Sequence, residues 1–180
     1  MLNRNQKANI LATIKWVLIA LYTLFSFAIM TTGAGGNAKP LLLMPIVVVI
    51  ALNENELISG ICGAFCGLLI DIACGKLVGI SGIYFLLVGV GSSFLFLHLM
   101  KRNLINTIII TAVASVIHGL LDFFFYYGLW GYSHLSVVFK EITIPSAIFT
   151  TISSVIYYFI ITKTIKVFTQ DDGTIQYKSK

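Results

Sequence analysis

The first group of residues that could carry chemistry is a carboxylate set among glycines in an apolar segment. Residues three and four apart share one face of a helix. This spacing joins Gly60, Gly63, Gly67, Asp71 and Gly75, with Gly79 closing the segment. Small residues let membrane helices approach closely, and an aspartate within a span costs roughly 2.5–3.5 kcal/mol on insertion scales. The pattern predicts a helix whose glycine face meets protein or a polar cavity.

A second polar face lies further along the chain. Thr111, Ser115, His118 and Asp122 follow one another at steps of four, three and four. His118 and Asp122 are one helical turn apart, so they can hydrogen-bond to each other. We expect Asp71, His118 and Asp122 to face a common polar interior. That cluster could be a partner-binding surface, a small-ligand pocket or a proton relay, or it could only fix helix packing.

The composition places these residues in a membrane protein. The chain has 180 residues, of which 58% are hydrophobic and 11% charged, whereas an ordinary soluble domain is about 25% charged. The apolar runs are continuous, as membrane-spanning helices require. The sequence therefore predicts an all-α integral membrane protein in the lipid bilayer.

Six apolar runs position the two polar faces. They cover residues 16–32, 41–52, 57–74, 80–100, 104–127 and 144–162. The second run is short for a span, which needs about 17–25 residues, and it contains Pro45. It could be a short span, a tilted span or a re-entrant segment. An aromatic loop, 128–143, separates the last two runs.

The distribution of basic residues favours six spans. With six, nine basic residues share the side of the termini and only Lys39, Lys76 and Lys140 take the other. With five spans the split would be five against seven. The positive-inside rule then predicts cytoplasmic N- and C-termini. We expect one six-helix transmembrane domain over residues 1–168 and a short cytoplasmic tail over 169–180.

The sequence gives little support to several classes of function. The net charge of +5 comes from residues flanking the spans, so we expect no nucleic-acid partner. Cys62 and Cys66 share their helix with no histidine, so we expect neither metal nor cofactor there. No nucleophile–base pair and no phosphate-binding loop is recognisable. The sequence therefore favours a protein that is not an enzyme.

The segment Gly60-x-x-Gly63-x-x-x-Gly67-Leu-Leu-x-Asp71-x-x-x-Gly75-x-x-x-Gly79 resembles the rod shape-determining protein MreD of bacteria. The short second run with Pro45, the length and the six spans are similar to that family as well. The resemblance implies a non-enzymatic subunit of the elongation (rod) complex in the plasma membrane, supporting lateral peptidoglycan synthesis and cell shape. It also implies that the glycine face binds the single span of a bitopic MreC-like protein. Further partners implied within the complex are a class B penicillin-binding protein, a RodA-type synthase and MreB.

A second hypothesis stays open beside the first. Six spans, this length and two carboxylates inside spans also suit the substrate-binding subunit of an energy-coupling-factor-type small-molecule importer. Such subunits often carry an Ala-x-x-x-Ala contact motif in the first span. Here Ala20 and Ala28 stand eight residues apart, which does not match.

Overall fold

A computed structural model describes the backbone of residues 4–32, 41–75, 77–125 and 143–169. The described part is helical and contains no strand. Its helices are α1 (Arg4–Thr31), α2 (Leu43–Asn53), α3 (Glu56–Cys74), α4 (Ile80–His98), α5 (Leu104–Phe123) and α7 (Ile144–Thr169). The predicted all-α class is confirmed.

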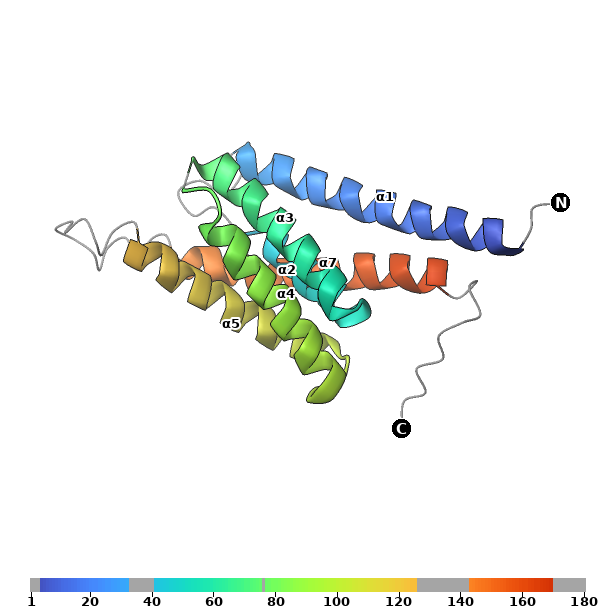
Figure 1. Cartoon of the computed structure of the whole chain (residues 1–180). Coiled ribbons are helices and arrows are strands. Elements are labelled where there is room, and N and C mark those ends of the chain that lie inside the picture. Colours follow the sequence, from blue (N-terminus) through green and yellow to red (C-terminus); the bar gives the residue numbers. More distant parts are fainter. Residues whose placement is uncertain (1–3, 33–40, 76, 126–142, 170–180) are drawn as a thin grey trace.

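The helices alternate in direction through one bundle (Figure 1). The first residues of α1, the α2–α3 turn, the α4–α5 turn and the last residues of α7 lie at one end, which we call the terminal end. The α3–α4 turn lies at the opposite end. Segment 41–53 therefore carries the chain back to the terminal end, and it does not re-enter on the side where it began.

The short helix α2 is the centre of the bundle. Every residue from Leu43 to Leu52 is buried, and the apolar residues other than Pro45 have at most 2% of their surface exposed. A helix that is apolar on all sides must be covered on all sides, and α2 contacts each of the other five described helices. At about 1.5 Å per residue, its 11 residues rise roughly 16 Å, half the hydrocarbon thickness.

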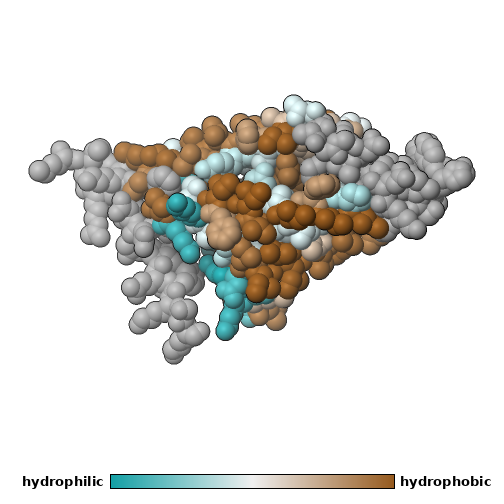
Figure 2. All heavy atoms as spheres, turned by 180° about the vertical axis from the view of Figure 1, so that it is seen from behind, coloured by the Kyte–Doolittle hydropathy of each residue, from teal (hydrophilic) through white to brown (hydrophobic). Residues whose placement is uncertain are grey.

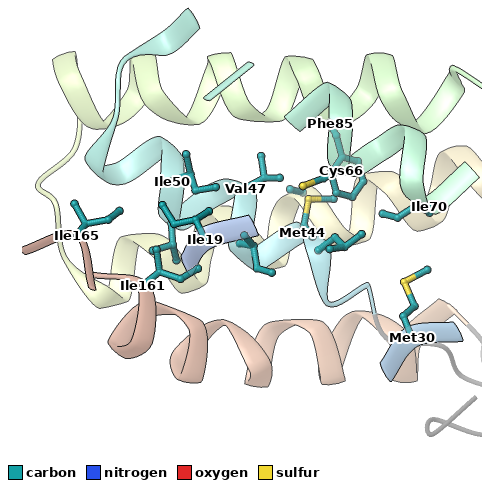
Figure 3. Packing of buried hydrophobic residues seen from close by; sticks show 14 residues of the cluster. Ile19, Met30, Met44, Val47, Ile50, Cys66, Ile70, Phe85, Ile161 and Ile165 are labelled. Carbon is teal, nitrogen blue, oxygen red and sulfur yellow. The ribbon is translucent and has the colours of Figure 1, made fainter. Parts of the chain in front are cut away.

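Pro45 is compatible with this central helix because of its position. It lies in the first turn of α2, where backbone N–H groups have no intrahelical acceptor. Figure 3 shows α2 side chains meeting those of other helices; the labelled members of this core are Ile19, Met30, Met44, Val47, Ile50, Cys66, Ile70, Phe85, Ile161 and Ile165.

Apolar side chains also cover the outside of the bundle, as expected for a surface in contact with lipid. Figure 2 shows them over most of the described part of one face, with hydrophilic side chains gathered towards the terminal end. Five helices are long and apolar enough to cross a membrane, the exception among the described helices being α2. The chain is a multi-pass membrane protein.

The observed helix bounds differ from the predicted runs mainly at the ends. α1 begins at Arg4, well before the predicted start of the first span at Trp16, and α7 continues to Thr169. The predicted tail beyond residue 169 and the aromatic loop from 128 to 142 lie outside the described residues. The cytoplasmic assignment of the terminal end stays a prediction from charge.

Candidate functional site

The glycine face of α3 is closed by α4 of the same chain. A β-carbon added to Gly63 would lie under 3.0 Å from the backbone oxygen of Phe85, and one added to Gly67 would lie equally close to that of Ser81. Real β-carbons essentially never approach so closely. At Gly60 the added atom would meet a methyl group of Val90 at 2.7 Å. Gly63 and Gly67 therefore let two helix backbones touch, as small residues do in membranes, while Gly60 makes room for a side chain of α4.

The close approach is reciprocal, since α4 contributes a glycine of its own. A β-carbon on Gly89 would lie under 3.0 Å from the backbone oxygen of Ser59 on α3. We call this contact, formed by Gly60, Gly63, Gly67 and Gly89, the glycine seam. The predicted helix-packing role of the three α3 glycines is thus met inside the chain. Their predicted role as a groove for another protein's helix is not, because α4 fills that groove.

Gly75 and Gly79 do not belong to the seam. Gly75 is the C-terminal cap of α3 with φ 61°, and Gly79 precedes α4 with φ 112°. No atom lies within 4 Å of a β-carbon added to either. The step of four residues continues past the end of the helix, so it no longer describes one face. These two glycines are needed for the left-handed backbone of the connection.

Asp71 is fully buried at the end of α3 and holds this connection in place. Its Oδ2 accepts the backbone N–H of Gly79 at 2.8 Å. Its backbone oxygen accepts the N–H of Gly75, which satisfies one of the carbonyls left over at a helix end. Within the described chain Oδ1 makes no hydrogen bond. A carboxylate in a span is therefore used to fix the turn between two helices.

His118 lies buried on α5 against the rings of two α4 residues. Its ring centroid is 5.2 Å from that of Tyr84 and 5.6 Å from that of Phe85, both edge-on. Its Nδ1 lies 3.6 Å from Oδ2 of Asp122. The predicted pairing of these two residues along one helix face is therefore present, at a distance somewhat longer than a hydrogen bond.

Asp71 does not join His118 and Asp122. In the part of the chain that the structure describes, no hydrogen bond or ion pair connects it to either residue. The reason is the position of α4, which packs on both α3 and α5 and separates them (Figure 1). Phe85 shows this directly, because its backbone faces Gly63 while its ring faces His118. The expected common polar interior is divided by a helix.

An ion pair that the sequence analysis did not anticipate attaches α1 to the bundle. Nζ of Lys15 donates to Oε1 of Glu54 at 2.7 Å, and each side chain is only 14% exposed. The same ammonium group lies 5.3 Å from the ring centroid of Trp16. Ser93 on α4 donates to the backbone oxygen of Glu54 at 3.1 Å. The available signal was a lysine immediately before the first apolar run and an acidic turn immediately after the second.

Three further hydrogen bonds tie helices together away from the seam. Tyr84 Oη donates to the backbone oxygen of Ala114, at 2.6 Å. The hydroxyls of Ser26 and Tyr157 are 2.6 Å apart and connect α1 with α7. The backbone N–H of Leu41 donates to Oγ1 of Thr150 at 3.0 Å. Most other hydroxyl groups of the described helices donate to a backbone oxygen three or four residues earlier in their own helix, as Thr23, Thr111 and Ser154 do.

The three cysteines lie in the core around α2 or pack against it. All are free thiols, and Cys66 is buried in the core around α2 (Figure 3). Among the described residues, no three of the His, Cys, Asp and Glu side chains gather in a way that could hold a metal ion.

Comparisons with known protein families, with characterised proteins and with solved structures found no match.

Proposed function

We propose that this chain is a non-enzymatic scaffold subunit of the bacterial elongation (rod) complex in the plasma membrane, as its resemblance to MreD implies. The observation that carries the proposal is the construction of the α3–α4 hairpin. The segment on which the resemblance rests forms the glycine seam and an Asp71-closed turn. Residues used in this way make a rigid helix pair, which suits a subunit that positions other membrane proteins.

The place where an MreC-like span would bind then differs from the one that the glycine pattern indicates. Because α4 fills the seam, a guest helix would pack on a different, outward face of α3, about a third of a turn from the glycines. Large apolar side chains of this face are exposed at steps of about one helical turn: Leu57, Ile61, Phe65, Leu68 and Ile72. Side chains of this size keep two helix backbones apart. A guest helix on this face would therefore pack through interlocking side chains and not through close backbone contact.

Co-purification tests the scaffold proposal directly. The chain would be co-expressed with a bitopic MreC-like protein from the same genome and captured by an affinity tag on the latter. We expect a stable complex that is weakened several-fold by the double substitution Ile61→Ala and Phe65→Ala. The matched control is Ile148→Ala with Phe149→Ala, an exposed pair on α7, and it should leave the complex unchanged.

Two outcomes would contradict this proposal. One is that no complex forms while both proteins are folded. The other is that the α3 and α7 variants lose the complex equally, which would remove the role of the α3 face. Cell width and the assembly of a RodA-type synthase with a class B penicillin-binding protein provide a second readout in the bacterium.

A small-molecule importer subunit is the second candidate, and one observation favours it. The buried His118, with Tyr84, Phe85 and Asp122 around it, places titratable and aromatic groups near the end of the bundle opposite the termini. If this is a binding site, mass spectrometry of the purified protein should find a small polar ligand that His118→Ala releases. A ligand found in this way, without an MreC-like complex, would favour the importer.

A further inference from the structure

Four exposed basic side chains lie at the terminal end of the bundle, on two neighbouring helices. Lys101 and Arg102 form the turn that leads into α5, and Lys163 and Lys166 lie in the last turns of α7. The two helices are antiparallel neighbours, since the end of α5 at Gly119 meets the start of α7 at Thr143. The beginning of α5 and the end of α7 therefore face the same membrane boundary.

The charge of these four side chains is not neutralised within the described residues. None of them makes a side-chain hydrogen bond or an ion pair there. Of the two carboxylates in the α2–α3 region, Glu54 is bound to Lys15, and Glu56 lies in the first turn of α3, where a negative charge complements the helix dipole. As far as the described residues go, the four cations thus remain available to an anion.

Apolar side chains continue directly from these cations into the span. On α7, Lys163 stands one turn beyond Phe159 and two turns beyond Ile156, both of which are exposed. On α5, Ile105 and Ile109 are exposed within two turns of Arg102. A molecule with an anionic head and long apolar chains would meet both kinds of surface at once. Long basic side chains at helix ends reach the headgroup level in this way.

We propose that the four basic residues, Lys101, Arg102, Lys163 and Lys166, form a binding surface for anionic phospholipids. Lipid phosphates lie against the α4–α5 turn and against the last turns of α7, and their acyl chains run along the exposed rows of α5 and α7. Arg102 supplies a planar donor group that matches phosphate oxygens, and the lysines act as mobile point charges. This inference depends on the membrane-spanning bundle and is independent of the proposed scaffold function.

Lipid retention by the full-length protein tests the surface. The protein would be purified in mild detergent, mixed with phosphatidylglycerol or phosphatidylcholine, and examined by native mass spectrometry. We expect selective retention of phosphatidylglycerol. Lys163→Gln with Lys166→Gln should weaken it by about fivefold for each lysine, given the usual attraction of a lysine to an anionic surface. Replacement of the same lysines by arginine should preserve retention, and inorganic phosphate should not compete.

A matched variant separates this surface from the overall positive charge. Lys178→Gln with Lys180→Gln removes the same charge from the C-terminal segment and should leave retention unchanged. Equal weakening by the two double variants would overturn the proposal, and so would unchanged retention in Lys163→Gln with Lys166→Gln. Equal melting temperatures of the variants without added lipid show that both are folded.

Discussion

Asp71 accepts the backbone N–H of Gly79 at 2.8 Å across the turn between two membrane-spanning helices. The bond closes the connection at the end where the seam glycines have already brought α3 and α4 together. A buried carboxylate thus acts on backbone geometry eight residues further along the chain. It makes α3 and α4 a single packing unit, and the first prediction follows from it.

Replacing Asp71 should separate the acceptor role from the charge. Asp71→Ala leaves the part-buried N–H of Gly79 without its acceptor, and loss of a typical hydrogen bond lowers the free energy of unfolding by about 0.5–1.5 kcal/mol. Asp71→Asn keeps an oxygen in the same place and should retain most of the stability. Unfolding of the purified protein in mixed micelles measures both. If the alanine variant were as stable as the wild type, the hydrogen bond would have no structural role.

Methyl groups added along the glycine seam should push the two helices apart. Gly63→Ala and Gly67→Ala each place a β-carbon against a backbone oxygen that cannot rotate away. Overpacking of this kind usually destabilises by about 1–3 kcal/mol. The control is Gly91→Ala on α4, where no atom lies within 4 Å of the added group. Unfolding should show a loss for the first two only, and equal values for all three would contradict the seam.

The two turn glycines should differ in the substitutions that they accept. Gly75, with φ 61°, lies in the left-handed region that asparagine tolerates, so Gly75→Asn should lose little stability. Gly79, with φ 112°, lies outside that region. Gly79→Asn should therefore be clearly less stable than Gly75→Asn, by about 1–2 kcal/mol. The same unfolding measurement checks it, and equal stability of the two variants or the reverse order would contradict the prediction.

The ion pair between Lys15 and Glu54 should couple α1 to the rest of the bundle. Lys15→Met and Glu54→Gln each leave one partly buried polar group without its partner. The double variant should lose less stability than the sum of the two, with a coupling of about 0.5–3 kcal/mol. A cysteine pair between α1 and α7 would report, through its cross-linking rate, whether α1 separates. Strict additivity of the two single changes would mean that the contact contributes nothing.

The sequence predicts the helices well because the apolar runs are long and separated by polar turns. It also identifies the glycine face of α3, since periodicity determines which residues share a face. It does not identify the neighbour on that face, which is α4 and not a partner protein. At Gly75 and Gly79 the same periodicity misleads, because the helix has ended. There, glycine itself signals a turn.

The polar contacts across the bundle were harder to foresee than the helices. Lys15 and Glu54 are 39 residues apart, and their meeting depends on how far the 11 residues of α2 carry the chain back. His118 and Asp122 could be paired because they belong to the same helix. Asp71 belongs to a different helix, and a polar side chain within a span does not reveal which helix lies between it and another polar side chain.

The burial of α2 has a consequence for how the protein is made. A segment about half a bilayer thick, enclosed by all five other described helices, gains its surroundings only when α7, the last of them, has left the ribosome. Until then its apolar sides depend on lipid, on an insertase or on a chaperone. Nascent chains that end before residue 144 should therefore be degraded readily by membrane quality-control proteases. The lifetime of these chains would report how long α2 stays without the cover that α7 provides.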